Sequence, residues 1–191
     1  LAVENALKTA FDWKTRLNIS KGIEQEAGEV IHFKQAFHGR SGYTLSLTNT
    51  KDPRKYEYFP KFNWPRIDNP KIQYPVTEEN LSKTIDNEQR AIEQIEKALS
   101  DRKNKIACII IEPIQGEGGD NFFRKEFFQK LRAICDKEEI LLIFDEVQTG
   151  MGMTGKMWAF QHYDVIPDVI SFGKKTQVCG ILANKEKLDQ I

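Results

Sequence analysis

Apolar residues are spaced along the chain in two patterns, and the two patterns alternate. In residues 1–16, 77–99 and 124–137 apolar side chains recur at helical spacing with charged ones between them, which predicts amphipathic helices. Residues 105–111 and 140–144 instead contain uninterrupted apolar runs, which are typical of strands buried on both faces of a parallel sheet. Strands that alternate with helices predict an α/β fold with a mostly parallel sheet.

Shorter stretches extend the same alternation. Residues 29–33, 169–172 and 178–182 are predicted strands, and residues 158–163 are a predicted short helix. We therefore expect one three-layer α/β/α domain, with the sheet in the centre.

The strand expected at 140–144 is followed by two carboxylates, Asp145 and Glu146. Ligands of open α/β sheets bind just beyond the carboxyl ends of the strands. Burying a carboxylate there is costly unless a cation or a set of hydrogen bonds compensates it. We therefore expect Asp145 to face a ligand site and to pair there with a positive group.

Residues 51–75 alternate prolines with aromatic residues. Such a loop is too apolar to be a solvated linker. We expect it to pack on a surface, for example at a contact between subunits.

Composition excludes some classes of partner. The 191 residues are 40% hydrophobic, enough for one domain with its own core. The 28 Lys and Arg residues balance 28 Asp and Glu residues, and this zero net charge does not favour binding to nucleic acid or to an anionic membrane. No apolar run approaches the roughly 20 residues of a membrane span, and no signal peptide is visible.

The three cysteines, Cys108, Cys135 and Cys179, are far apart and lack CxxC spacing. This pattern is typical of reduced thiols in a cytosolic protein. For Cys179, packing in the core is favoured over a role as a nucleophile near a site.

Residues 150–156 (GMGMTGK) nearly match a phosphate-binding P-loop. Met157 stands where that motif needs a Ser or Thr hydroxyl to bind magnesium, and the segment does not lie directly between a strand and a helix. A plain turn is therefore the favoured interpretation of this segment, ahead of the phosphate-binding loop of a nucleoside triphosphatase.

Residues 171–176 (SFGKKT) place two lysines at the end of a predicted buried strand. A lysine that is desolvated or near other cations loses its proton more readily and can form a Schiff base. The alternative is a solvated pair of lysines on a turn, and this segment alone favours that alternative.

Three segments, residues 112–118 (EPIQGEG), 144–150 (FDEVQTG) and 172–174 (FGK), occur in this order at the expected strand ends. Together they resemble the class III aminotransferases, which have fold type I and depend on pyridoxal 5'-phosphate, and the similarity runs across essentially the whole chain. Residues 37–50 and 172–180 are most similar to members of this family that act on lysine. The resemblance implies transfer of the terminal (ε) amino group of L-lysine to 2-oxoglutarate in lysine catabolism, giving 2-aminoadipate 6-semialdehyde and L-glutamate.

The same resemblance implies which residues hold the cofactor. Lys174 is expected to form the Schiff base and later to move the proton, because the family's Phe-Gly-Lys order selects it over Lys175. Asp145 is expected to pair with the ring nitrogen, Gln148 to reach the phenolic oxygen, and Phe37 to stack on the ring.

Substrate residues are implied in the same way. Arg40 is expected to grip the α-carboxylate in a bidentate fork, which leaves the far amine of lysine to react. Gln148 is expected to border the substrate, and Glu117 to act as a switch that shields a second arginine, carried by the family's C-terminal domain. Glu112 is expected to be a carboxylate near the cofactor.

Members of this family are considerably longer than this chain. We expect residues 1–191 to be the central part of the cofactor-binding large domain, with an N-terminal segment and a C-terminal small domain outside it. A phosphate-binding turn is expected just before Leu1, where helix amides would meet the phosphate. The intact protein is expected to be a cytoplasmic homodimer.

Two alternatives stay open. Another ω-aminotransferase, acting on ornithine or 4-aminobutyrate, would share all the cofactor residues, and only Arg40 and residues 175–179 argue against it. A catalytically inactive fragment of the fold is the second alternative.

Overall fold

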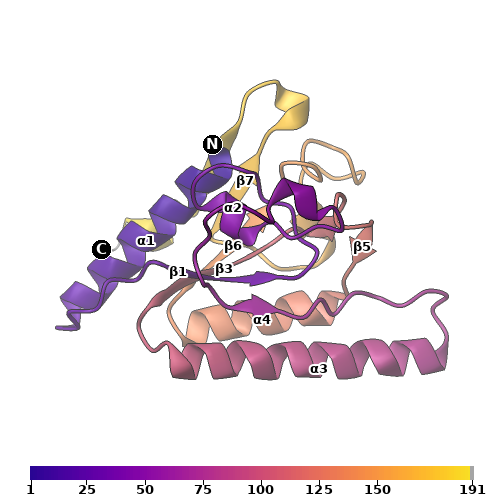
Figure 1. The fold of residues 1–191 in the computed structure, drawn as a ribbon, viewed down its shortest axis with the longest axis horizontal. Coiled ribbons are helices and arrows are strands. Elements are labelled where there is room, and N and C mark those ends of the chain that lie inside the picture. Colours follow the sequence, from indigo (N-terminus) through magenta and orange to yellow (C-terminus); the bar gives the residue numbers. More distant parts are fainter. Residues whose placement is uncertain (190–191) are drawn as a thin grey trace.

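A computed structural model describes residues 1–189 and contains a six-stranded sheet with helices on both faces (Figure 1). The sheet consists of β1 (Glu29–Phe33), β2 (Arg66–Ile67), β3 (Ile106–Ile111), β6 (Leu141–Asp145), β7 (Val169–Phe172) and β8 (Gly180–Ala183). Its order is β2-β1-β3-β6-β7-β8, and every neighbouring pair is parallel except β7 with β8. The predicted α/β fold with a mostly parallel sheet is confirmed.

The remaining elements surround this sheet. The helices are α1 (Ala2–Ser20), α2 (Thr44–Leu47), α3 (Glu78–Asp101), α4 (Lys125–Lys137) and α5 (Lys185–Leu188). Single 3₁₀ turns are η1 (Pro53–Lys55), η2 (Ala159–His162) and η3 (Lys174–Thr176), and β4 (Ile114–Gln115) pairs with β5 (Asn121–Phe122) in a small antiparallel ribbon.

Two apolar cores explain the three layers. Side chains of β3 alternate between them, because successive residues of a strand point to opposite faces. Ile109 and Ile111 pack in the core under α3 and α4, whereas Cys108 and Ile110 pack in the core under α1. All six residues of β3 are buried, as its continuous apolar run predicts.

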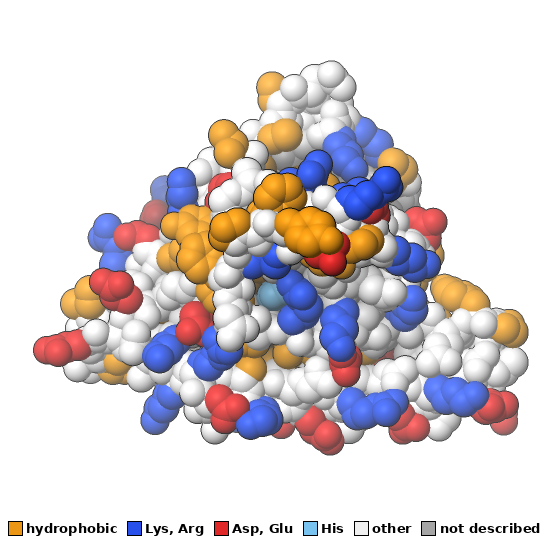
Figure 2. Space-filling view, viewed as in Figure 1, with side chains coloured by type: hydrophobic (Ala, Val, Ile, Leu, Met, Phe, Trp, Pro, Cys, Tyr) orange, Lys and Arg blue, Asp and Glu red, His pale blue; other side chains and the backbone are white. Residues whose placement is uncertain are grey.

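Helix α3 departs from its predicted apolar face in its first half. Leu81 and Ile85 remain 39% and 41% exposed, while Thr84 and Glu88 are buried instead. The reason is that this half packs against polar groups, since Arg124 pairs with the Glu88 carboxylate at 3.1 Å. The charged outer side of α3 lies along the lower edge in Figure 2, where both signs of charge alternate.

The aromatic loop packs only in part. Phe62 and Trp64 stack with ring centroids 4.9 Å apart, and Tyr43 lies against both rings. Tyr58, by contrast, is 87% exposed, and Phe59 is also exposed. Within this chain the loop therefore packs around Trp64, whereas Tyr74 near its end is exposed.

Three smaller predictions need correction. The helix predicted at 158–163 is the single 3₁₀ turn η2, and the strand predicted at 178–182 begins only at β8, with Val178 exposed. Cys179 is exposed and not packed in the core, because it lies in the loop that leads into this antiparallel edge strand.

Cys108 and Cys135 are buried free thiols. Residues 150–156 form turns, as the plain interpretation of that segment predicts. No helix within residues 1–189 combines the length and the apolar character needed to cross a membrane.

Parallel strands place their carboxyl ends at one edge of the sheet. Here β1, β3, β6 and β7 all end at that edge. The loops that follow these strands carry most of the candidate site residues, so the fold itself brings distant parts of the sequence together.

Candidate active site

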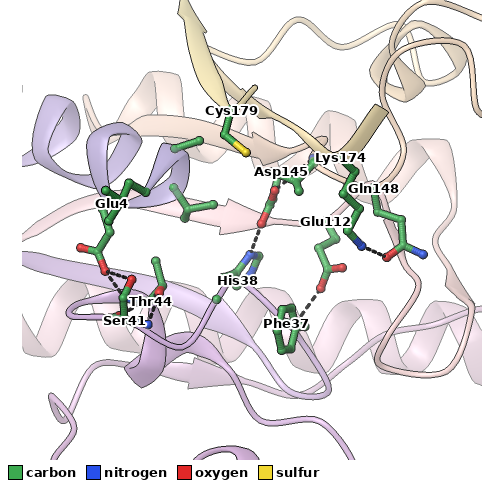
Figure 3. A pocket seen from close by; sticks show the side chains of 15 residues that line it. Glu4, Phe37, His38, Ser41, Thr44, Glu112, Asp145, Gln148, Lys174 and Cys179 are labelled. Atoms are coloured by element: carbon green, nitrogen blue, oxygen red, sulfur yellow. Dashed lines mark hydrogen bonds and ion pairs between the residues drawn. The ribbon is translucent and has the colours of Figure 1, made fainter. Parts of the chain in front are cut away.

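A pocket lies at this edge of the sheet, between the first turn of α1 and the loop after β1 (Figure 3). Its polar and aromatic lining comes from five segments of the chain. The main contributors are Glu4, Phe37, His38, Glu112, Asp145, Gln148 and Lys174. Five of the predicted site residues, from Phe37 to Lys174, therefore meet in one place.

Asp145, the last residue of β6, is held by three hydrogen bonds. Its Oδ2 lies 2.8 Å from Nδ1 of His38, and its Oδ1 accepts from the Ser171 hydroxyl at 2.8 Å and from the Val147 amide at 3.2 Å. The residue is only 4% exposed. The buried acid thus has the imidazole of His38 as its partner within the chain.

His38 was not among the residues expected from the sequence. Its side chain is fully buried, and burial alone would lower the pKa of the imidazole. The hydrogen bond and charge of Asp145, together with the charge of Glu112, outweigh burial and raise that pKa. Its adjacency to Phe37 in the segment 37–40 was the one signal in the sequence that could have indicated it.

Glu112 lies at the end of β3 and is also buried. Its Oε1 accepts the backbone N–H of Phe37 at 2.8 Å. Burial, aided by the nearby charge of Asp145, raises the pKa of this carboxyl to about 7, although His38 and Lys174 oppose the shift. Glu112 can therefore change its protonation state near neutral pH.

Lys174 opens the turn η3 just beyond β7. Its Nζ donates to Oε1 of Gln148 at 2.8 Å, and its backbone has a left-handed φ of 51°. Such a conformation costs a non-glycine residue about 1–3 kcal/mol and is enriched at functional sites. Lys174 lines the pocket whereas Lys175 does not, which favours the lysine selected from the sequence.

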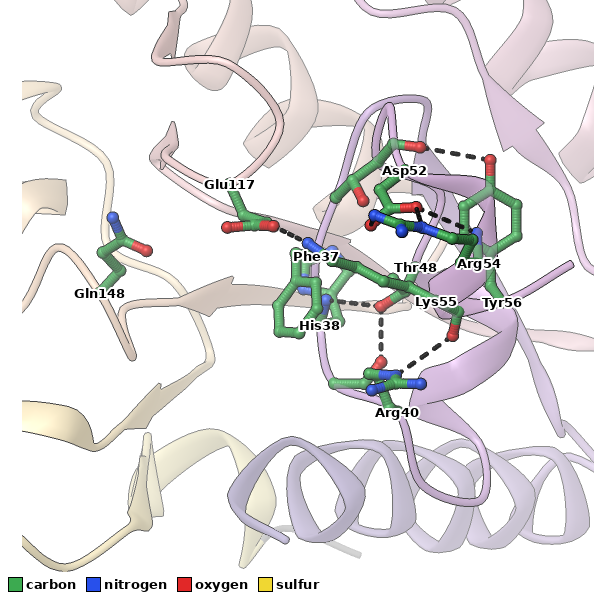
Figure 4. A network of polar contacts seen from close by, with 12 residues as sticks. Phe37, His38, Arg40, Thr48, Asp52, Arg54, Lys55, Tyr56, Glu117 and Gln148 are labelled. Atoms are coloured by element: carbon green, nitrogen blue, oxygen red, sulfur yellow. Dashed lines mark hydrogen bonds and ion pairs between the residues drawn. The ribbon is translucent and has the colours of Figure 1, made fainter.

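Arg40 and Glu117 lie outside the lining of this pocket (Figure 4). Both attach to Lys55: the Arg40 Nε donates to the Lys55 carbonyl at 3.2 Å, and Glu117 forms an ion pair with the Lys55 ammonium. That ammonium also stands 5.8 Å from the centroid of the Phe37 ring. The structure therefore connects the two residues to Phe37 through Lys55, and their substrate roles stay predictions.

Glu146 follows Asp145 but is not part of the pocket lining. Its carboxylate accepts from the Thr149 hydroxyl at 2.6 Å and from the amides of Ala159 and Phe160 at 3.0 and 2.8 Å. Glu146 therefore fastens the turn after β6 to η2.

The first turn of α1 forms the remaining wall of the pocket. The amide groups of a first helical turn have no partner inside the helix, and the helix dipole favours negative charge there. A pocket with this wall, a buried carboxylate, an amine and an aromatic ring can accommodate an aromatic ring that carries a phosphate and an aldehyde.

Comparison with known proteins gives a consistent family assignment. The family model described as "Aminotransferase class-III" matches residues 1–188. The "L-lysine-epsilon aminotransferase" of Mycobacterium tuberculosis is 54% identical over 192 residues, covering 100% of this chain and 42% of that protein. The protein of the same name from Amycolatopsis lactamdurans is 49% identical, covering 95% of this chain and 40% of its own length.

A relative with another name is less similar. The "4-aminobutyrate aminotransferase" of Emericella nidulans is 42% identical over 166 residues, covering 86% of this chain and 32% of that protein. This chain spans about two fifths of the length of the L-lysine-epsilon aminotransferases described above, with 42% and 40% of their lengths covered.

Solved structures agree with these matches. The structure described as "Lysine aminotransferase from M. tuberculosis in the internal aldimine form" superposes with a TM-score of 0.93 at 53% identity, covering 98% of this chain and 42% of that one. An omega-transaminase from Thermomicrobium roseum superposes with a TM-score of 0.77 at 26% identity, covering 100% of this chain and 43% of that one.

Proposed function

Since this chain belongs to the class III aminotransferases, we propose that the intact protein transfers the terminal amino group of L-lysine to 2-oxoglutarate. The products would be 2-aminoadipate 6-semialdehyde and L-glutamate. The observation that carries the reaction type is that Lys174 and Asp145, on neighbouring strand ends, line one pocket. The choice of lysine is supported by similarity to lysine enzymes over the whole chain.

The family assignment confirms the resemblance seen in the sequence, and with it the dependence on pyridoxal 5'-phosphate. The donor set of the pocket fits that cofactor, because an amine, a buried carboxylate and an aromatic ring are the groups that its aldehyde, pyridine nitrogen and ring face require. When bound, the cofactor supplies an electron sink for bonds broken at the substrate carbon.

Each of the pocket residues would then have a separate role in holding the cofactor or in moving the proton. Asp145 pairs with the protonated ring nitrogen, and His38 and Ser171 hold its carboxylate in place. Lys174 supplies the amine that anchors the cofactor and afterwards carries the proton at the reacting carbon. Gln148, which is 2.8 Å from the Lys174 amine, borders both the cofactor and the substrate.

Phe37 and Glu112 act as a pair in this proposal. The Phe37 ring would cover a face of the bound cofactor, and the hydrogen bond from the Phe37 amide to Glu112 at 2.8 Å ties this residue to the end of β3. Glu112 lies close enough to His38, Asp145 and Lys174 to influence the charge of the whole site.

Arg40 is proposed to bind the substrate α-carboxylate, and Glu117 to adjust the site between the two substrates. For this role the Arg40 guanidinium would leave the Lys55 carbonyl and turn toward the pocket. An arginine is suited to such a change, since its long side chain is exposed and its fork matches a carboxylate. Holding lysine by its α-carboxylate would direct the far amine to the cofactor.

We further propose that residues 1–191 are the central part of the cofactor-binding domain of a longer protein, which acts as a cytoplasmic homodimer. The exposed aromatic side chains of Tyr58 and Phe59 support a subunit contact, because exposed apolar clusters mark interaction sites. The free cysteines suit a reducing compartment.

The test uses the full-length protein with pyridoxal phosphate, 2-oxoglutarate and three amino donors, which are lysine, ornithine and 4-aminobutyrate. We expect kcat/KM for lysine to exceed that for ornithine, which is one methylene shorter, by about tenfold or more. Formation of glutamate with ornithine or 4-aminobutyrate preferred would overturn the choice of lysine but keep the family. No glutamate with any donor would overturn the aminotransferase activity itself.

A further inference from the structure

Glu4, on the first turn of α1, is a buried carboxylate with no cationic partner among residues 1–189. It is 7% exposed and lines the pocket. Its hydrogen bonds all come from one short segment: the Ser41 hydroxyl at 3.1 Å and the amides of Tyr43 and Thr44, both at 3.3 Å. A buried acid satisfied only by one loop fixes that loop to its helix.

That loop continues directly from the residues that build the pocket. Its other end is held by two more buried carboxylates, because Glu112 accepts from the Phe37 amide and Asp145 binds His38. Three acids, from α1, from the end of β3 and from β6, therefore hold the two ends of segment 37–44 (Figure 3).

The middle of the segment is braced by Thr48, which follows α2. The Thr48 hydroxyl accepts from the His38 amide at 3.0 Å and donates to the Gly39 carbonyl at 2.6 Å. A displacement at residues 41–44 would therefore be passed on to His38 and not absorbed by a loose linker.

Close packing makes the contact with Glu4 specific. A Cβ placed on Gly42 would lie 2.9 Å from Glu4 Oε1, and the φ of Gly42 is +29°. The backbone of the loop therefore approaches the carboxylate as closely as a residue without a side chain allows.

We propose that Glu4 is a positioning residue for the cofactor pocket. Its carboxylate joins two walls, the first turn of α1 and the loop after β1, and thereby sets where Phe37, His38 and Arg40 stand. This inference rests on the proposed function only in taking the pocket as the site of pyridoxal phosphate.

The number of hydrogen bonds that each Glu4 variant loses predicts a graded loss of cofactor affinity. The carboxylate offers two oxygens to three donors, with the Tyr43 amide on Oε2 and the other two on Oε1. In Glu4→Gln one carboxylate oxygen becomes an NH₂ group, so at least one partly buried donor loses its acceptor, while Glu4→Ala removes the acceptor of all three donors.

The experiment measures two quantities in the full-length protein: the dissociation constant of pyridoxal phosphate, followed by its visible absorption, and hydrogen exchange of the amides in residues 37–48 without cofactor. We expect Glu4→Gln to weaken cofactor binding about tenfold, Glu4→Ala to weaken it further, and exchange at Tyr43 and Thr44 to accelerate. Asp12→Asn is the matched control, because Asp12 is an exposed carboxylate on the same helix that pairs with Arg16. It should leave both quantities unchanged.

Faster exchange with unchanged cofactor affinity in Glu4→Gln would overturn the proposal, since Glu4 would then hold the loop without serving the pocket. Unchanged exchange would overturn it as well. Should Glu4→Ala fail to fold, Glu4→Gln and Ser41→Ala carry the test, the latter removing one of the three bonds. Neither readout depends on the amino donor, so the result can be interpreted even if the substrate assignment is wrong. If the wild-type protein binds no cofactor, the proposed function is contradicted, and not the role of Glu4.

Discussion

The imidazole of His38 lies 2.8 Å from the carboxylate of Asp145, across 107 positions of sequence and with both side chains buried. This contact joins the loop after β1, which forms one wall of the pocket, to the end of β6, where Asp145 lines the same pocket. The buried Asp145 thereby keeps a hydrogen-bond donor on one oxygen, and Ser171 and Val147 satisfy the other.

Removal of His38 should loosen the cofactor site. In His38→Ala, Asp145 loses the partner of Oδ2, so we expect the affinity for pyridoxal phosphate to fall about tenfold to hundredfold. His38→Asn, whose side-chain amide can donate in place of Nδ1, should restore part of it. Cofactor titration of the full-length variants measures both effects.

The control for this prediction is His162→Ala. His162 is exposed and bonds only to Thr154 among residues 1–189. Loss of affinity in His162→Ala equal to that in His38→Ala would indicate a general defect and contradict the role given to the contact.

Glu112 should make stability depend on pH. Its pKa is about 7 in the folded chain against an ordinary 4.5, so the folded state binds more protons between these values. The contribution of Glu112 to the free energy of unfolding is therefore greatest below about pH 4.5. It decreases as the pH rises toward 7, by a total on the order of 3 kcal/mol.

Glu112→Gln isolates this effect, because an amide cannot titrate. The difference in unfolding free energy between wild type and Glu112→Gln, measured without cofactor in the full-length protein, should change across pH 4.5–7 and be constant above this range. A difference that is flat across the whole range would show that the carboxyl titrates normally.

The two adjacent lysines should differ sharply. Lys174→Ala removes the amine that lines the pocket, so we expect loss of borohydride-dependent attachment of the cofactor and a fall in kcat of at least about 10²–10⁴-fold. Lys175→Ala should keep the attachment and most of the activity. Attachment that survives in Lys174→Ala, or is lost in Lys175→Ala, would reverse the assignment.

The fold was predictable where a local pattern determines the structure. The apolar runs at β3 and β6 predicted buried parallel strands, and their order predicted that Asp145 and Lys174 would share a sheet edge. The exposure of Leu81 and Ile85 was not predictable, because it depends on what the first half of α3 meets in space.

The sequence indicated five residues that line the pocket, but not the residues that hold these side chains in place. His38 and Glu4 act through partners 107 and about 40 positions away, and no spacing in the sequence encodes such pairs. The position of Arg40 depends on which of several carbonyls and carboxylates its long side chain meets. Neither composition nor periodicity predicts which partner the Arg40 side chain contacts.

Arg40 provides the sharpest test of how substrates are held. If its guanidinium binds the α-carboxylate, Arg40→Ala should raise the KM of both lysine and 2-oxoglutarate by about tenfold to hundredfold, the value of a charge-assisted hydrogen bond. Affinity for pyridoxal phosphate should stay near that of wild type, because Arg40 lies outside the lining of the pocket. Arg54→Ala is the matched control, since Arg54 is an exposed arginine of the same loop region that pairs with Asp52. Equal KM values in the two variants would mean that Arg40 only braces the Lys55 carbonyl, and the α-carboxylate would then need another partner.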